Sequence, residues 1–378
     1  MVETKDKQIQ KSYTVIIVGG GPAGVATALT LNSLGISNCV VEANESPNRK
    51  YGEALPPNSK PLLRQLGILS LVEDGHHQKY YGNQSCWGSD HLNQKEFITE
   101  IHGHGFLLDR LYFEKQLWGA YQQDNGLLLT GGKLKKLERT DTGFDLSITH
   151  SDNTIEIKCK YVVDATGRKA SVCRQLGISK IDLDSQFAIS FTLNFEVVIQ
   201  SKIIIEATRN GWWYAAPVGL KEIAVMFFTL KELLPQKENV NEFLIGELSA
   251  SFHLSNIISD SQLTEIDPKI IPSGTSRLKS PYGKNWIAVG DAAFAYDPIS
   301  SYGITSALAS GYYAGQAIAS KITGKEEAMD AYRYIVENAF QAYNEKLVNH
   351  YNLEQRFQGS YYWENRLSSP KIKLTELK

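Results

Sequence analysis

The feature that most constrains this chain is an apolar run that leads directly into a glycine-rich loop. Residues 13–18 read YTVIIV, a β-branched run typical of a strand that is buried on both faces. The loop GGGPAG follows, in which Gly19, Gly21 and Gly24 match the spacing GxGxxG, and a helix is predicted over 22–34. Such glycines allow a tight turn, close approach of the backbone to a pyrophosphate, and close packing of the helix on the strand. The N-terminus of the helix then faces the charge of the phosphates.

A second apolar run, CVVE, supplies an acid at a suitable distance from this loop. Glu42 ends the run 18 residues after Gly24, where a carboxylate can accept hydrogen bonds from the hydroxyls of a ribose. An acid at this point disfavours a phosphate group on that ribose. A lone glycine loop also occurs as a structural turn, but strand, loop, helix and acid in register predict a βαβ unit that binds a dinucleotide.

The late stretch IAVGDAAFAYDP predicts a second contact with the same ligand. Asp291 stands where an apolar run stops, and a helix of small residues, GITSALASGYYAGQAIAS, begins at Gly303. An acid at a strand end can hold sugar-like hydroxyls, and we expect the small residues to let the helix lie close to a flat ligand, with its positive end toward it. Asp297 either orients this helix or caps it. An ordinary loop and cap is the alternative for the stretch alone, but together with the first loop it indicates a long dinucleotide held from two ends.

The middle of the chain changes to an alternating pattern. In residues 187–195, large apolar side chains alternate with small or polar ones, a period of two that marks an antiparallel sheet with one buried face. Further strands are predicted at 202–207, 211–216 and 222–230. The fold class is therefore α/β, a Rossmann-like dinucleotide-binding domain with an inserted, mostly antiparallel β-sheet substrate domain and C-terminal helices. We place the nucleotide-binding domain at residues 11–74, 106–180 and 267–325, the substrate domain at 75–105 and 181–266, and a C-terminal helical segment at 326–378.

Composition argues against several other classes of function. Lys plus Arg number 39 against 41 Asp plus Glu, which disfavours a large basic surface for nucleic acid. No apolar run approaches the ~18 residues of a membrane span. Four scattered cysteines without a CxxC pair suggest neither a zinc site nor a disulfide framework, and they predict a reduced, cytoplasmic setting. His102 and His104 lack a third ligand at metal-binding spacing, so no metal is predicted.

Three motifs resemble the FAD signatures of the class A flavoprotein monooxygenase superfamily, which includes the flavin-dependent halogenases and the geranylgeranyl-reductase-like proteins. They are GGGPAG with Glu42, DATG at residues 164–167, and GDAA followed by DPISSYG. The resemblance spans most of the chain and implies FAD as the cofactor of a PHBH-type domain. It departs from the superfamily's hydroxylases at DATG, where those enzymes have a DG dipeptide, and no second GxGxxG offers NAD(P)H a separate site.

The same resemblance assigns individual residues to FAD. The residues assigned are Gly19, Gly21, Ala23, Gly24, Glu42, Arg110, Asp164, Gly167, Asp291, Pro298 and Gly303. Within this set, the first loop and Glu42 hold the ADP half, Asp291 holds the ribitol, and residues 298–303 lie beside the isoalloxazine ring. Arg110, in LLDRLYFEKQL, matches an arginine near the FAD diphosphate, although a structural salt bridge is an alternative.

Two further stretches resemble the halogenase-like branch of the superfamily. The string YGEALPPN resembles a GEAxxP segment near the flavin, which makes Glu53 a candidate to steer a proton, or else to cap a helix. Pro298 and Gly303 are the other flavin-adjacent candidates for the catalytic centre. The string GWWYAAP resembles a Trp-rich strand that leads to a proline, but its tryptophans are adjacent and do not meet the pattern WxWxIP. Halogenases also need a lysine; Lys79 could occupy its place, but a surface lysine is favoured, and halogenation is not predicted.

The strings GEALPPN, CWGS, HGHGFLLDR and YYWENR together most resemble the LodB/GoxB-type flavoproteins, which mature tryptophylquinone-containing amino-acid oxidases. This resemblance implies that NAD(P)H reduces the flavin, O2 reacts with it, and one oxygen atom passes to an indole carbon of a precursor oxidase. The precursor would dock on aromatic side chains near residues 76–91. Candidates for the substrate pocket wall are Trp212, Trp213, Tyr214 and Phe228, for which core packing is the alternative. A small-molecule halogenase or hydroxylase of an aromatic substrate, and a geranylgeranyl-reductase-like FAD oxidoreductase, remain alternative functions.

Overall fold

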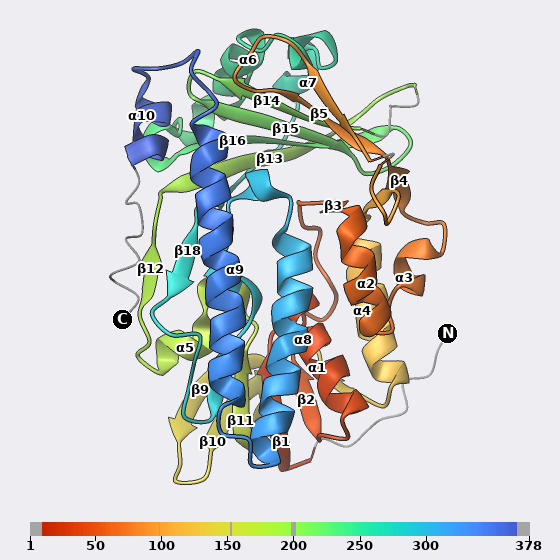
Figure 1. The fold of residues 1–378 in the computed structure, drawn as a ribbon, viewed down its shortest axis with the longest axis vertical. Helices are drawn as coiled ribbons and strands as arrows, with labels where there is room; N and C mark the ends of the chain where they lie inside the picture. Colours follow the sequence, from red (N-terminus) through yellow and green to blue (C-terminus); the bar gives the residue numbers. More distant parts are fainter. Residues whose placement is uncertain (1–9, 98, 152, 198–201, 369–378) are drawn as a thin grey trace.

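The computed structural model describes residues 10–368 with gaps at 98, 152 and 198–201, so the end of the predicted C-terminal segment lies outside the described residues. A mixed sheet flanked by helices forms the lower part of Figure 1, and a second, mostly antiparallel sheet lies above it. The α/β fold class is confirmed, with its Rossmann-like domain, its inserted antiparallel sheet and its C-terminal helices.

The first sheet forms around the strand that precedes the glycine loop. Its apolar, β-branched residues are buried on both faces, as parallel strands covered by helices require. The strand β1 pairs in parallel with both β2 and β11, and β11 pairs in parallel with β20. The strand β11 is long and runs without a break into the DATG motif. The members of this sheet are β1 (Ser12–Val18), β2 (Asn38–Val41), β8 (Leu127–Leu129), β9 (Lys133–Arg139), β10 (Phe144–His150), β11 (Asn153–Asp164), β19 (Tyr282–Gly283) and β20 (Trp286–Ala288).

Helices surround this sheet. The helices α1 and α8 pack side by side, and α9 runs along α8 toward the second sheet (Figure 1). Asp109 caps α4 by accepting a hydrogen bond from the Tyr112 N–H. The helices are α1 (Pro22–Ser33), α2 (Lys60–Gln65), α3 (Ser70–Glu73), α4 (Arg110–Gln123), α5 (Ser171–Gln175), α8 (Gly303–Ile322) and α9 (Ala328–Tyr351).

The second sheet matches the alternating middle of the chain. It runs in the order β17-β13-β16-β15-β14-β5-β6, so strands from the segment 75–105 complete it, and β17 lies beyond the predicted domain boundary at 267. Its strands are β5 (Gly82–Cys86), β6 (Asn93–Glu96), β13 (Gln186–Asn194), β14 (Ile203–Thr208), β15 (Gly211–Pro217), β16 (Glu222–Leu230) and β17 (Lys269–Pro272). The helices α6 (Val240–Ser249) and α7 (Asp260–Thr264) cover its outer face.

Short elements join the two parts. One small sheet holds β3 (Ala54–Leu55), β4 (Gln78–Tyr80) and β7 (Gly105–Leu107), and another holds β12 (Lys180–Asp182), β18 (Ser276–Leu278) and β21 (Phe294–Ala295). The end of α9 and the helix α10 (Tyr361–Ser368) pack on the inner face of the second sheet.

In the described part of the chain, no helix combines the length and the apolar character needed to cross a membrane.

Candidate active site

The glycine loop after β1 has one open side. A Cβ at Gly19, whose φ is +112°, would lie 2.2 Å from the Ala165 carbonyl oxygen, and a Cβ at Gly24 would lie 2.0 Å from the Gly19 carbonyl oxygen. A Cβ at Gly21 would meet nothing within 4 Å. The first and third glycines are therefore required by the protein itself, whereas the middle one leaves space at the N-terminus of α1. This cradle fits a pyrophosphate, which needs close backbone approach and the positive end of a helix.

Glu42 lies directly after β2 and contacts this loop. Its Oε2 accepts the Gly20 N–H at 2.7 Å, and its Oε1 accepts the N–H and the side-chain amide of Asn44 at 2.9 and 2.7 Å. A carboxylate offers about four acceptor positions, so capacity remains for a ribose hydroxyl. The Trp118 indole on α4 donates to the Gly20 carbonyl at 2.6 Å, a contact that the sequence analysis did not predict.

The DATG motif shapes the turn beneath the glycine loop. Asp164 is fully buried; its Oδ1 accepts the N–H and the hydroxyl of Thr166 at 3.0 and 2.7 Å, and its Oδ2 accepts the Cys173 N–H at 2.8 Å. These bonds hold Ala165 under Gly19 and engage both carboxylate oxygens within the protein. Asp164 therefore supports the site by fixing the backbone of this turn. Gly167, the last residue of the motif, has a φ of +64°, and a Cβ there would meet nothing within 4 Å.

The second glycine-acid stretch returns to the first. Gly290, with φ +57°, packs so closely that its Cβ would lie 2.9 Å from the Ala23 Cβ, and its N–H donates to the Ser310 hydroxyl at 2.8 Å. Asp291 follows in a short 3-10 helix (Gly290–Ala292), and its carboxylate lies 3.4 Å from the Arg168 Nε. The structure thus brings Asp291 beside the N-terminus of α1. It also shows a residue of the site that the sequence analysis missed, Arg168, which directly follows DATG in the sequence.

Two glycines within α8 pack this helix tightly on α1. A Cβ at Gly311 would lie 2.2 Å from the Ala23 carbonyl oxygen, and a Cβ at Gly315 would lie 2.7 Å from the Thr30 Cβ. These two glycines let α8 pack on α1. The expectation that small residues of this helix let it lie close to a flat ligand stays a prediction. The start of α8 is open, because a Cβ at Gly303 would meet nothing within 4 Å. Pro298 begins the 3-10 turn (Pro298–Ser300) that leads to this helix and is half-buried.

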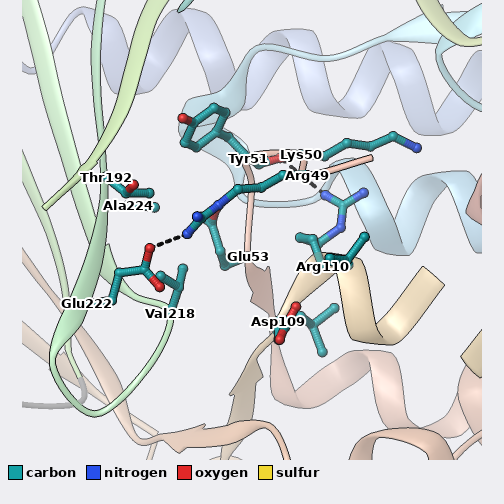
Figure 2. Close-up of a pocket in the computed structure, with 12 residues that line it drawn as sticks. Arg49, Lys50, Tyr51, Glu53, Asp109, Arg110, Thr192, Val218, Glu222 and Ala224 are labelled. Carbon is teal, nitrogen blue, oxygen red and sulfur yellow. Dashed lines mark hydrogen bonds and ion pairs between the residues drawn. The ribbon is translucent and has the colours of Figure 1, made fainter. Parts of the chain in front are cut away.

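A pocket of about 190 Å³ lies where the loop after β2 and the N-terminus of α4 meet the second sheet. Figure 2 shows its three sides: the loop after β2, the N-terminus of α4 and the strands of the second sheet. Arg49 spans the pocket and pairs with Glu222 on β16. The lining residues are Arg49, Lys50, Tyr51, Glu53, Leu108, Asp109, Arg110, Leu111, Thr192, Val218, Glu222 and Ala224.

Arg110 holds one wall of this pocket in place. Its Nη1 donates to the Gly52 and Tyr51 carbonyls at 2.8 and 3.2 Å, and its Nη2 pairs with Glu114 at 2.7 Å. The structural salt bridge considered from the sequence is therefore present. The Arg110 Nε is buried and has no partner within the protein, so the guanidinium retains a donor for an anionic group.

Glu53 is a buried carboxyl without a full set of partners. It is 2% exposed, and its Oε2 has no hydrogen-bond partner within the protein. Burial raises the pKa of Glu53 to about 7, against the opposing effect of the Arg110 charge. The Tyr214 hydroxyl is likewise unpartnered, and burial together with the charge of Glu53 raises its pKa well above the usual value. A carboxyl that titrates near neutrality in a pocket is suited to proton transfer.

The predicted aromatic wall is divided between two faces of the second sheet. Trp213 packs with the residues under α6, and its indole donates to the Glu247 carbonyl at 3.4 Å, so it cannot line the inner pocket. Adjacent residues of a strand point to opposite faces, which corrects that assignment. Trp212 stacks on Phe228 with ring centroids 4.0 Å apart, and both are core residues. Tyr214 is the member of the set that lies near Glu53.

Lys79 and His102, two residues considered in the sequence analysis, lie elsewhere. Lys79 is on β4 and is exposed, as expected of a surface lysine. His102 is exposed, and its carbonyl accepts a hydrogen bond from the Lys60 ammonium at 2.9 Å. Among the described residues, no three His, Cys, Asp or Glu side chains gather closely enough to hold a metal ion.

The chain belongs to the FAD binding domain family, which matches residues 12–344. It is an FAD-dependent oxidoreductase of the monooxygenase type, and the halogenases are among its relatives. Its sequence is 26% identical over 364 residues to LodB of Marinomonas mediterranea, whose name describes it as an FAD-dependent oxidoreductase, and the match covers 94% of this chain and 97% of LodB. It is 23% identical to the tryptophan 2-halogenase of Chondromyces crocatus, covering 94% of this chain and 71% of that protein.

Solved structures share the fold. The myxobacterial chondrochloren halogenase CndH superposes with a TM-score of 0.84 at 17% identity, covering 94% of this chain and 86% of that chain. QhpG, described as a peptidyl tryptophan dihydroxylase essential for tryptophylquinone cofactor biogenesis, superposes with a TM-score of 0.77 at 21% identity, covering 96% of this chain and 80% of that chain.

Replacing Gly21 with alanine tests the cradle. The apoprotein should retain its thermal midpoint, because the new methyl meets no protein atom within 4 Å. FAD affinity should fall at least about tenfold, because the methyl occupies the space into which a pyrophosphate would fit. Titration of the apoprotein with FAD measures this. Gly119→Ala, on α4 and equally open, is the matched control. An equal loss of FAD affinity in both variants would contradict the assignment of the pyrophosphate to this loop.

Proposed function

We propose that this protein is an FAD-dependent monooxygenase that uses NAD(P)H and O2 to hydroxylate a tryptophan side chain of a precursor amino-acid oxidase, during formation of a protein-derived quinone cofactor. The similarity to LodB along nearly the whole of both chains supports a role of this kind. QhpG, which shares the fold, is described as a peptidyl tryptophan dihydroxylase. With four buried, unpaired cysteines, we assign the protein to the cytoplasm.

The observation that carries the proposal is the pocket that contains Glu53. Its volume, about 190 Å³, is below the ~300 Å³ at which pockets for drug-sized molecules begin. Such a pocket suits one side chain presented by a protein better than a large free substrate. Arg49 and Glu222 line this pocket and are partly exposed, and their ion pair joins the loop after β2 to the second sheet.

The reaction needs a proton acceptor as well as a cofactor. Bound FAD supplies the redox chemistry that activates O2, with NAD(P)H as the reductant typical of the family. For each hydroxylation, O2, NAD(P)H and one proton are consumed; one oxygen atom enters a C–H bond of the indole and the other leaves as water. Glu53, with a pKa of about 7, would take the proton that the ring carbon releases as aromaticity returns. Tyr214, close to this carboxyl, can hold it in position.

The remaining residues position the cofactor. The loop at residues 19–24, with Glu42, would hold the ADP half, and Asp291 would hold the ribitol. Arg110 fixes the Tyr51–Gly52 backbone that precedes Glu53, and its free Nε is available to the diphosphate. Residues 298–303 would then lie beside the isoalloxazine ring.

A comparison of substrate classes tests the proposal. We expect O2-dependent NAD(P)H oxidation by the FAD-loaded protein to rise on addition of a precursor oxidase, and to respond little to free tryptophan or indole with or without chloride or bromide. A halide-dependent product from a free indole would instead indicate a halogenase. NAD(P)H-driven reduction of an alkene without O2 would indicate the geranylgeranyl-reductase-like alternative.

A further inference from the structure

The helix α10 carries a charged side chain into the interior of the protein. Arg366 is 8% exposed, and its guanidinium lies over the Tyr351 ring at 4.4 Å. Its Nη1 is 2.8 Å from the Asp184 Oδ2, and its Nη2 contacts the Asp297 Oδ2. A side chain near the end of the described chain thus binds two carboxylates at once.

The two carboxylates belong to different parts of the fold. Asp184 precedes β13 and accepts the backbone N–H groups of Gln186 and Thr275, each at 3.0 Å. Asp297 caps the 3-10 turn that leads to α8: its Oδ1 accepts the Ile299 N–H at 2.8 Å, and its Oδ2 accepts the Tyr351 hydroxyl at 3.0 Å. Arg366 therefore ties the turn at 297–300 to the base of the second sheet.

The charges make this arrangement specific for arginine. Two buried carboxylates surround one guanidinium, and removing the cation would leave uncompensated charge in the interior. Burial raises the pKa of Asp297, although Arg366 opposes this effect. The planar fork of arginine can serve two carboxylates in fixed directions, whereas a lysine ammonium provides a compact charge without that geometry.

The tied segment also carries backbone strain. Ser301, between the 3-10 turn and α8, has a φ of +50°, in the left-handed region that non-glycine residues rarely adopt. Such a conformation persists only where the surroundings impose it, and it recurs at functional sites. The Asp297 contacts fix one end of the segment, and the start of α8 at Gly303 fixes the other.

We propose that Arg366 is a positioning residue that holds the segment 297–302, through Asp297, in the conformation that faces the flavin. The inference rests on the proposed place of residues 298–303 beside the isoalloxazine ring. In this way the helix α10 helps to set the environment of the flavin. Arg366 is the last residue of the YYWENR string, so the inference also gives that string a physical role.

Flavin spectroscopy without any substrate tests this inference. We expect Arg366→Lys to fold and bind FAD, but to shift the visible absorption bands and the midpoint potential of the bound flavin and to weaken FAD binding roughly tenfold, within the range over which such networks couple. Arg366→Met should shift them further; if it does not fold, the lysine variant decides. Arg356→Met is the control, because Arg356 pairs with Glu354 and Asp90, outside this cluster.

The outcomes are distinct. Unchanged bands, potential and FAD affinity in Arg366→Lys would overturn the inference, as would equal shifts in Arg356→Met. Gly303→Ala separately tests the flavin-adjacent assignment, since its methyl meets no protein atom within 4 Å, and an unaltered flavin spectrum there would remove the basis of the inference. None of these measurements uses a tryptophan substrate, so failure of the proposed hydroxylation would leave the result for Arg366 standing.

Discussion

Replacing Glu53 with glutamine should lower kcat by roughly 10²–10³, the range typical of losing a positioned acid or base. The change preserves the shape of a side chain that is only 2% exposed, but it removes the group that takes the proton. Steady-state turnover of a precursor substrate, with FAD loading held equal, measures the effect.

The pH dependence should identify Glu53 as the group involved. Because burial raises its pKa to about 7, the base form accumulates only as pH rises through that value, so kcat/KM of the wild type should rise across the same interval. Glu53→Gln should lose this limb of the profile, because an amide does not titrate.

Glu53 should also make the stability of the protein depend on pH, in the direction opposite to its effect on kcat/KM. Its folded pKa, about 7, is raised above the ordinary value of 4.5, so its stabilising contribution is complete below the ordinary value and is lost as pH rises through the folded one. Above that range, burying the charged form costs roughly 3 kcal/mol. Denaturation of the apoproteins at high pH should therefore find Glu53→Gln more stable than the wild type.

The control for the turnover measurement is Glu222→Gln. Glu222 lines the same pocket, but its side chain is 30% exposed and pairs with Arg49, and exposed ion pairs contribute little. We expect its turnover to fall by less than about threefold, which is under 1 kcal/mol. Equal losses in the two variants would assign the Glu53 effect to the shape of the pocket instead of to proton transfer.

Replacing Gly311 with alanine should reduce the free energy of unfolding by roughly 2–3 kcal/mol, in the range for overpacking a tight contact. The added Cβ would lie 2.2 Å from the Ala23 carbonyl oxygen and 2.9 Å from the Ala26 Cβ, so α8 and α1 must separate. Ala23 belongs to the glycine loop and also touches Gly290, so FAD affinity should fall with stability. Chemical denaturation of the apoprotein and FAD titration measure the two effects.

Gly246→Ala gives the opposite sign and serves as the control. Gly246 is an exposed position of α6 where a Cβ meets nothing within 4 Å, so alanine should stabilise the helix by about 0.5–1 kcal/mol. If Gly311→Ala also stabilised the protein and left FAD binding intact, the close packing of α8 on α1 would not support the cofactor site.

The cofactor domain was predictable because its signals are local. A β-branched run, glycines at fixed spacing and the acid Glu42 each constrain a few neighbouring residues, and the period of two in residues 187–195 gave the second sheet in the same way. The proximity of Asp291 to the first glycine loop was also predictable, because each lies where an apolar strand ends and each has residues suited to binding part of a dinucleotide. The sequence also contained the information that Trp212 and Trp213 cannot line the same pocket, because neighbouring residues of a strand point to opposite faces.

Other features depend on side chains that meet only in three dimensions. Nothing near Arg366 indicates that it binds Asp184 and Asp297, which lie far away in the sequence. Gly311 and Gly315 show that α8 packs closely on something, but not that the partner is α1. The unpartnered oxygen of Glu53 depends on the second sheet closing over it, and no spacing in the sequence reports such burial.

The most direct test of the proposed function is the mass of tryptophan-containing peptides from a precursor oxidase treated with this protein, NAD(P)H and isotopically heavy oxygen gas. Wild-type protein should add one or two heavy oxygen atoms to a single tryptophan, and Asp291→Ala, which removes a proposed cofactor contact, should add none. If FAD-loaded wild-type protein consumed NAD(P)H but left every precursor peptide at its original mass, tryptophan hydroxylation of a protein substrate would be contradicted.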